Sequence, residues 1–168
     1  MLSALALLVA LQDAPAPAAE PPRRYGDAGT SHFGLALGIG GGGGGFAWLV
    51  GGEYGYFVVD GLAPGVEARL SGGTGLPTVG LTLGTLRFMP LRTESVSLVL
   101  IGRGGRVYLT DHADGWGVGG GAGLIYFTSA HVGLQISYDY LRLLPASFCA
   151  DLSRCTLQGL GLGLVMGF

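Results

Sequence analysis

The sequence of 168 residues predicts an all-β protein: a closed antiparallel up-and-down transmembrane β-barrel with eight strands. Three observations lead to this fold class: a two-residue alternation of large apolar and small residues, a charged fraction of only 12%, and 34 glycines. An average soluble domain carries about 25% charged residues, so this chain has too little charge to coat a soluble globule. The glycines argue against membrane helices, because each costs a helix on the order of 1 kcal/mol.

The alternation is clearest at the end of the chain, where residues 160, 162, 164, 166 and 168 are large and their neighbours are mostly glycine. Large residues facing lipid and small residues facing a narrow lumen produce this pattern. The sheet must close, because an open edge in hydrocarbon leaves backbone groups unpaired at several kcal/mol each. Eight strands enclose a lumen that side chains fill, which predicts a plugged barrel rather than a pore. The expected strands are 32–41, 46–57, 62–72, 78–88, 95–107, 115–127, 131–143 and 156–168.

The connections between these strands differ in length, as in outer-membrane barrels with short periplasmic turns and longer outer loops. The expected periplasmic turns are 58–61, 89–94 and 128–130, and the expected outer connections are 42–45, 73–77, 109–114 and 144–155. Between residues 78 and 107 the positions of Arg87, Arg103 and Arg106 do not fit one strict alternation, and we expect a bulge there.

Aromatic residues are expected to form two belts at the membrane surfaces, because an amphipathic ring prefers the headgroup level. The periplasmic belt is predicted to contain Phe33, Tyr54, Tyr56, Phe57, Phe88, Tyr126, Phe127 and Phe168. The outer belt is predicted to contain Phe46, Trp48, Tyr108, Trp116, Tyr138 and Tyr140.

The N-terminal segment predicts export. Leu2–Leu11 is an apolar segment of signal-peptide length, although no Arg or Lys precedes it, and residues 16–18 form a small-x-small cleavage site. We therefore expect a signal peptide over residues 1–18, a flexible periplasmic lead-in over 19–31, and the barrel over 32–168. The alternative for the first segment is a buried N-terminal helix.

Residues 31–168 resemble the small eight-stranded outer-membrane barrels of Gram-negative bacteria, of the OmpA/OmpX type. The resemblance rests on the terminal strand 157–168, on the aromatic strand end and turn 55–62, and on the glycine-rich strand 115–123. It implies an outer-membrane location, outer-membrane lipid as the surrounding partner, and assembly by the barrel-assembly machinery. The assembly signal it implies consists of Phe168, Met166, Leu164 and Leu162.

Two sets of residues are candidate structural sites. Cys149 and Cys155 lie in the longest outer loop, and an exported protein passes through an oxidising compartment, so we expect a loop disulfide. Five charged residues are expected on lumen-facing positions, where unpaired charge is very costly, and we predict lumen ion pairs among them. These five are Glu53, Glu67, Arg69, Arg103 and Asp139, and the alternative is a proton or ion path.

No catalytic or metal site is predicted, and no cofactor. His32, His112 and His131 are scattered along the fold, and the alternative of a weak cation site at His112 with Asp111 and Asp114 is less favoured than a solvated loop. Ser129 lies near His131 only in a tight periplasmic turn. Ser147 and Asp151 have no histidine in their loop.

The predicted function is that of a non-enzymatic, monomeric integral outer-membrane barrel with a side-chain-filled lumen and a structural or surface-contact role. The net charge is −2 and the sequence has no run of basic residues, so it does not predict a basic surface that binds nucleic acid. One alternative is a soluble or periplasmic lipocalin-like barrel that binds an apolar ligand, which needs large residues inside and charge outside. The other is a lipid-modifying outer-membrane enzyme.

Deleting Phe168 should strongly lower the amount of assembled barrel in cells, because this residue ends the predicted assembly signal. The measurement is the amount of heat-modifiable protein in the outer-membrane fraction. A deletion variant that reaches the outer membrane at the wild-type level would show that Phe168 is not part of a sorting signal.

Overall fold

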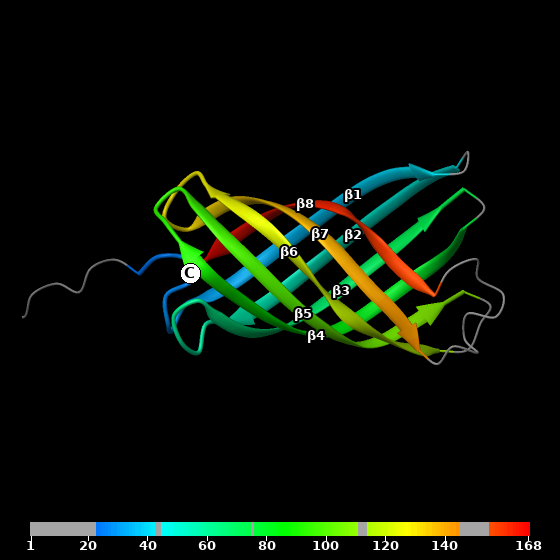
Figure 1. The fold of residues 1–168 in the computed structure, drawn as a ribbon, viewed down its shortest axis with the longest axis horizontal. Helices are drawn as coiled ribbons and strands as arrows, with labels where there is room; N and C mark the ends of the chain where they lie inside the picture. The colour runs from blue at the N-terminus through cyan, green and yellow to red at the C-terminus, as the bar shows by residue number, and fades with distance from the viewer. Residues whose placement is uncertain (1–22, 43–44, 75, 111–113, 145–154) are drawn as a thin grey trace, which may run out of the picture.

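The computed structural model describes residues 23–42, 45–74, 76–110, 114–144 and 155–168, so the predicted signal peptide lies outside the described residues. Eight antiparallel strands close into one up-and-down barrel in chain order (Figure 1), which confirms the predicted fold class. Each strand lies within a few residues of its expected position. The strands are β1 (Ser31–Gly42), β2 (Gly45–Tyr56), β3 (Leu62–Gly73), β4 (Leu76–Arg92), β5 (Val96–Leu109), β6 (Gly115–Phe127), β7 (Val132–Leu144) and β8 (Thr156–Gly167).

The barrel has two different ends. We call the end where β1 begins and β8 finishes the terminal end, and the opposite end the loop end. At the terminal end the strand connections have three to five residues. At the loop end two connections have two residues each, one has five, and the longest, between Leu144 and Thr156, has eleven. Described residues include no helix long and apolar enough to cross a membrane.

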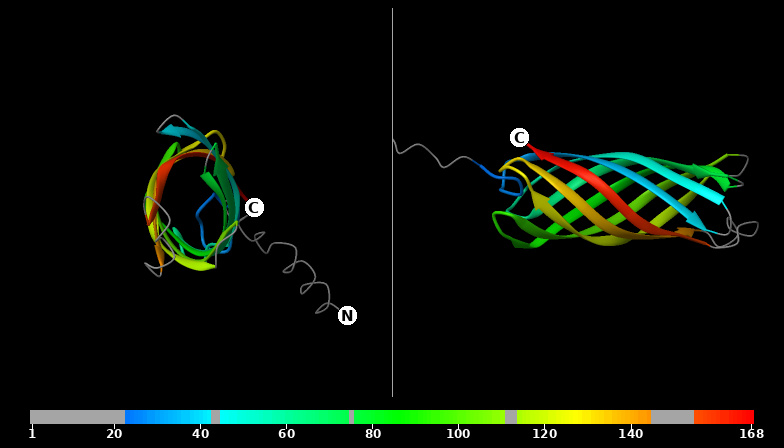
Figure 2. Two further views of the ribbon diagram at one scale, coloured as in Figure 1. Left: turned by 90° about the vertical axis from the view of Figure 1, so that its right-hand side faces the viewer. Right: turned by 90° about the horizontal axis from the view of Figure 1, so that it is seen from above.

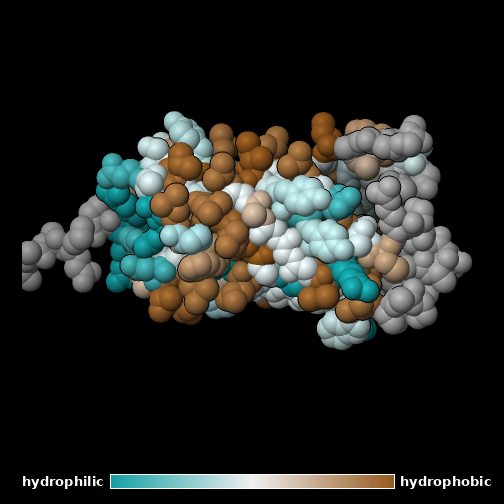
Figure 3. All heavy atoms as spheres, in the orientation of Figure 1, coloured by the Kyte–Doolittle hydropathy of each residue, from teal (hydrophilic) through white to brown (hydrophobic). Residues whose placement is uncertain are grey.

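Most strands follow the predicted alternation, with large apolar side chains outside. Leu134, Ile136 and Leu162 are each more than half exposed, whereas Glu67 and Arg103 are buried inside. Figure 3 shows the apolar side chains gathered around the middle of one face, beside a hydrophilic rim at the terminal end. This arrangement is the reverse of a lipocalin-like barrel, which needs a polar exterior.

In β4 and β5 the assignment of large residues to the outside is wrong. Leu81 and Leu83 are buried inside, while Gly84 and Gly104 face outward on paired positions. The alternation itself is strict, since Arg87 and Arg103 point inward and Arg106 points outward. A register shift between Phe88 and Leu91 does occur, but it lies beyond Arg87 and is not needed to place the three arginines.

Two aromatic residues expected in the belt lie inside the barrel instead. Phe57 is fully buried and Phe127 is partly buried, and both pack in the hydrophobic cluster at the terminal end. Tyr54, Tyr56, Phe88, Tyr126 and Phe168 are exposed as predicted. Of the residues expected in the outer belt, all are exposed: Phe46, Trp48, Tyr108, Trp116, Tyr138 and Tyr140.

Residues 23–30 fold across the terminal end, unlike the flexible lead-in expected for 19–31. The Tyr25 amide donates to the Ala130 carbonyl, and the Gly61 amide donates to the Gly26 carbonyl. Gly26 has a φ of 93°, in the left-handed region that favours glycine. Residues 23–30, which Figure 2 shows at the terminal end, are held there by backbone hydrogen bonds to the strand connections.

Ile136→Arg should prevent insertion, and the polar substitution Ser137→Asn at the adjacent lumen position should be tolerated. Ile136 is 57% exposed on the outer wall near the middle of β7, whereas Ser137 is buried on the lumen side. An arginine on the lipid face near the bilayer midplane costs about 2–4 kcal/mol, and a lumen position does not carry this cost. The measurement is the yield of heat-modifiable barrel after refolding into lipid vesicles. Equal yields for the two variants would contradict the assignment of faces.

Candidate functional site

The lumen contains layers of side chains between the terminal end and the loop end. The first layer is the hydrophobic mouth cluster, and two charged layers follow toward the loop end. A second apolar layer and a cavity occupy the half nearer the loop end. The mouth cluster consists of Tyr25, Phe57, Ala63, Met89, Val99, Ile101, Ile125, Phe127 and Val165.

Tyr25 brings residues 23–30 into the mouth cluster. Its ring packs edge-on against Phe57, with ring centroids 5.4 Å apart, and lies 5.5 Å from the Phe127 ring. Burial raises the pKa of the Tyr25 phenol to about 12, so the phenol stays neutral in this apolar layer. The mouth cluster therefore blocks the lumen at the terminal end with uncharged groups.

The next layer, which we call the Glu53 cluster, consists of Glu53, His32, Thr85, Arg87 and Gln135. Arg87 Nη2 donates to Glu53 Oε2 at 2.8 Å, and Arg87 Nη1 donates to Gln135 Oε1 at 2.9 Å. His32 Nε2 lies 3.4 Å from Glu53 Oε1, and the Thr85 hydroxyl donates to the same oxygen at 3.3 Å. Arg87 is 1% exposed, so its charge is neutralised by protein groups rather than by solvent.

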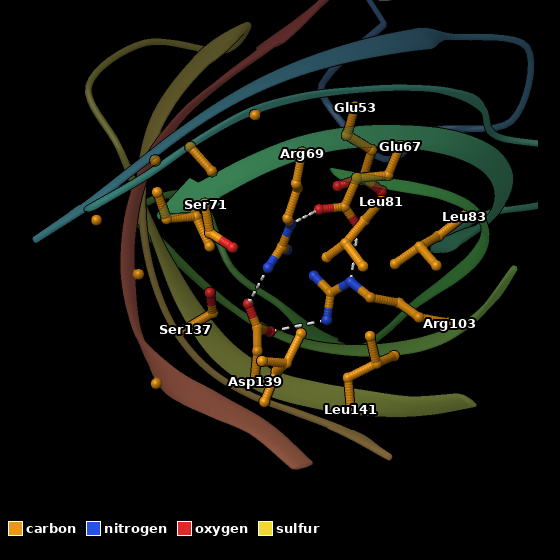
Figure 4. Close-up of a pocket in the computed structure, with 18 of the residues that line it drawn as sticks. Glu53, Glu67, Arg69, Ser71, Leu81, Leu83, Arg103, Ser137, Asp139 and Leu141 are labelled. Atoms are coloured by element: carbon orange, nitrogen blue, oxygen red, sulfur yellow. Dashed lines mark hydrogen bonds and ion pairs between the residues drawn. The ribbon is translucent and has the colours of Figure 1, made fainter. Parts of the chain in front are cut away.

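The third layer, the Glu67 ring, consists of Glu67, Arg69, Arg103 and Asp139. Arg103 Nε donates to Glu67 Oε2 at 2.7 Å, and Arg103 Nη1 donates to Asp139 Oδ1 at 2.8 Å. Arg69 pairs with the other oxygen of Glu67 and donates to Asp139 Oδ2 at 2.9 Å. Figure 4 shows the two guanidinium groups between the two carboxylates, so each acid contacts both arginines. The four formal charges cancel.

Two glycines make room for the Glu67 ring. A Cβ atom at Gly121 would lie 2.3 Å from Asp139 Oδ1, and one at Gly51 would lie 2.7 Å from the Arg69 side chain. Real Cβ atoms do not approach other atoms this closely, so a larger residue at either position displaces a charged side chain. The small residues on lumen positions thus leave space for the paired side chains, in addition to fitting the narrow lumen.

The structure brings four of the five predicted lumen charges into one ring and separates the fifth. Glu53 and Glu67 are direct partners on β2 and β3, but their cations differ, since Glu53 pairs with Arg87. Sequence reasoning missed Arg87, His32, Thr85 and Gln135 as members of this layer. Strict alternation in β4 could have placed Arg87 in the lumen together with Leu81, Leu83 and Thr85. Residue size did not show which face is inward, because the inward residues of β4 are as large as the outward ones.

Between the Glu67 ring and the loop end the lumen is not filled, which corrects the prediction of a side-chain-filled interior. A cavity of about 850 Å³ lies there and continues past the ring as far as Glu53, Arg87 and Gln135, which also line it. One wall carries Leu81, Leu83 and Leu141, and the opposite wall carries the lumen glycines of β1, β2 and β8. Ser71 and Ser137 also line the cavity (Figure 4), so its surface is apolar with a few hydroxyl groups above a charge-balanced base.

The remaining positions considered in the sequence analysis lie either outside the described residues or in strand connections. Cys149, His112, Asp111, Ser147 and Asp151 lie outside the described residues, so the disulfide of Cys149 with Cys155 stays a prediction. The Ser129 hydroxyl accepts the backbone amides of His131 and Val132 in the β6–β7 connection, which is the tight turn expected for this pair. Within the described ranges, no three His, Cys, Asp or Glu side chains are arranged as metal ligands.

Comparison with known proteins finds similarity in structure only. No protein-family model and no curated protein matches the sequence. A de novo designed transmembrane β-barrel aligns with 84% of this chain and 98% of its own, at 15% identity and a TM-score of 0.50. The N-terminal β-barrel domain of Pseudomonas aeruginosa OprF aligns with 84% of this chain and 98% of its own, at 16% identity and a TM-score of 0.54. The P. aeruginosa outer membrane protein OprG aligns with 88% and 99%, at 13% identity and a TM-score of 0.49.

These likenesses establish the fold. The chain is a small eight-stranded barrel of the kind seen in the OprF N-terminal domain and in the designed transmembrane barrel. At 15–16% identity they assign no site residue. The candidate site of this chain is therefore defined by its own lumen residues.

Arg87→Met should destabilise the barrel far more than Arg69→Met. Without Arg87, Glu53 keeps only His32 and Thr85 as partners in a buried layer, and breaking a buried pair in this way costs about 3–5 kcal/mol. Without Arg69, Arg103 still bridges Glu67 and Asp139. The measurement is the urea unfolding midpoint in vesicles, and Glu53→Gln combined with Arg87→Met should recover part of the loss. Equal midpoints for the two single variants would contradict two separate layers.

Proposed function

We propose that this chain is a non-enzymatic integral outer-membrane barrel that does not conduct ions and has a structural or surface-contact role. The observation that carries this proposal is the combination of an apolar outer wall with a lumen sealed by paired charges. The terminal end, with short connections and the strand termini, is the periplasmic side, and the loop end is the cell surface. Outer-membrane lipid is then the main partner, and the barrel-assembly machinery acts during biogenesis.

The outer wall supports membrane embedding. Exposed leucine, isoleucine, valine and aromatic side chains occupy most outward positions, and a soluble monomer rarely exposes a contiguous apolar patch beyond a few hundred Å². The barrel also closes its sheet, which satisfies the backbone in a solvent that offers no hydrogen bonds. The structural neighbours with a TM-score of at least 0.50 include a designed transmembrane barrel and an outer-membrane barrel domain.

The sealed lumen supports a role other than ion transport. A permeating ion meets the Glu67 ring, past which the cavity continues, and then has to cross the Glu53 cluster and the mouth cluster. In the first two layers every charged side chain already has an opposite partner, and the third is apolar. Breaking these pairs leaves buried charges uncompensated, so the closed arrangement is favoured.

The lipid-modifying enzyme is the weaker candidate. In the described ranges no serine hydroxyl is hydrogen-bonded to a histidine ring, which a Ser-His-acid mechanism requires. The imidazole of His32 faces Glu53 within the sealed lumen, with no route for a lipid ester from the terminal end. A structural or surface-contact role needs no such arrangement.

The purified protein should give no steady single-channel steps in planar lipid bilayers, because three successive layers close the lumen. A large porin reconstituted in the same bilayers provides the positive control. Steady conductance steps from the wild-type protein at several voltages would contradict the sealed lumen and make transport the leading function.

A further inference from the structure

The first and last strands of the barrel pair with each other over only part of their length. His32–Leu37 of β1 pair with Leu162–Gly167 of β8, and the register stops there. Residues 38–42 of β1 and 156–161 of β8 pair only with β2 and β7 on their other sides. Figure 1 shows β1 and β8 diverging toward the loop end, and we call the unpaired edges between them the seam.

The side chains along the seam are unusually open. Ile39 on β1 is 81% exposed and Leu160 on β8 is 73% exposed, more than any other large hydrophobic residue described in the chain. A Cβ atom added at Gly159 would meet nothing within 4 Å. A continuous sheet brings neighbouring strands to within about 5 Å. At Gly38 the strands still meet, since an added Cβ would lie 3.8 Å from the Leu160 carbonyl oxygen, so the opening begins beyond this point toward the loop end.

The cavity above the Glu67 ring reaches this opening. Its lining includes Leu81 and Leu141 from the lumen face together with Ile39 and Leu160, which lie at the seam and whose side chains are exposed. The lumen space is therefore continuous with the outer wall at the seam. Unpaired backbone at membrane depth is tolerated where it lines such a cavity, and not where it faces hydrocarbon alone.

The chemistry of the cavity selects an apolar occupant. Leucines line one wall, glycines leave space on the other, and the base has no unpaired charge to bind an ionic headgroup. A volume of about 850 Å³ lies within the range of about 300–1,000 Å³ typical of small-molecule sites. Since the seam opens in the half nearer the loop end, the polar end of a membrane-borne amphiphile stays at that surface while its chain enters.

We propose that the seam is a lateral portal through which a hydrocarbon chain, from a fatty acid or a membrane lipid, moves out of the bilayer into the cavity. This inference rests on the proposed membrane embedding. The portal opens in the half nearer the loop end, and the mouth cluster closes the opposite end of the lumen, so chain binding and the absence of ion conductance are compatible.

Photo-labelling with diazirine-bearing palmitic acid, and separately with a phosphatidylcholine that carries the same chain, tests the portal. The full chain is reconstituted in vesicles, irradiated, and mapped by mass spectrometry. We expect adducts on the lumen residues Leu81 and Leu141 in addition to the outward Leu124 and Leu134. Interior labelling by the fatty acid alone identifies a free acid as the occupant, and labelling by both probes identifies membrane lipid as well.

Two variants test the route and the space. Gly161→Leu fills the cavity, since an added Cβ meets only Ser137 Oγ at 3.6 Å, and interior adducts should be lost. Gly84→Leu adds the same side chain on the outer wall, where a Cβ meets only the Gly104 carbonyl oxygen at 3.6 Å, and should label like the wild type.

Gly38→Cys with Gly161→Cys, in a background with Cys149→Ser and Cys155→Ser, should close the seam when oxidised. These two positions form the next inward pair beyond the existing register, and each accepts a Cβ at ordinary contact distance. Interior labelling should be lost on oxidation and return on reduction.

Interior labelling that persists with the seam closed would overturn the portal in favour of entry through the loop end. Its absence in the wild type, with outward leucines labelled, would overturn chain binding. Loss of labelling on the outward leucines as well would show instead that membrane embedding has failed.

Discussion

The requirement that every backbone group be hydrogen-bonded in hydrocarbon determines most of this molecule. It forces the eight strands into a closed barrel, and a barrel of this size has a narrow lumen. Within that lumen charge is costly, so Glu67, Arg69, Arg103 and Asp139 neutralise one another at hydrogen-bonding distance. Glycines at Gly51 and Gly121 are in turn needed because the ring occupies the space that a Cβ would take.

The lumen is divided into two halves with different chemistry. Toward the terminal end, aromatic and charged side chains fill it, and Tyr25 from outside the strands completes the packing. Toward the loop end, leucines on one wall face glycines on the other, and the volumes do not match, so a cavity remains. The same half contains the seam. One short barrel therefore combines a lumen that is closed at the mouth cluster with a cavity in the half nearer the loop end.

The strand positions could be predicted from the sequence because period-two alternation and glycine-rich turns are local signals. The outward face of a strand could be predicted only where the side chains on its two faces differ in size, as in β7 and β8. In β4, Leu81 and Leu83 face the lumen and Leu86 faces outward, so residue size gives no direction. Pairing of Glu53 with Arg87 depends on the register of strands distant in sequence, which no local pattern specifies. The folded path of residues 23–30 likewise depends on hydrogen bonds to three connections that are remote in the chain.

The short pairing of β1 with β8 also bears on how the barrel forms and opens over time. It joins the two ends of the barrel sequence, and it has six residue pairs where β1 and β2 have twelve. Contacts between distant segments carry the largest loop-closure entropy and form late in folding. The joint that closes last is thus also the one with fewest bonds, and local opening should cost least there. Residues 23–30 tie the start of β1 to the neighbouring connections, which confines this local opening of the wall to the half nearer the loop end.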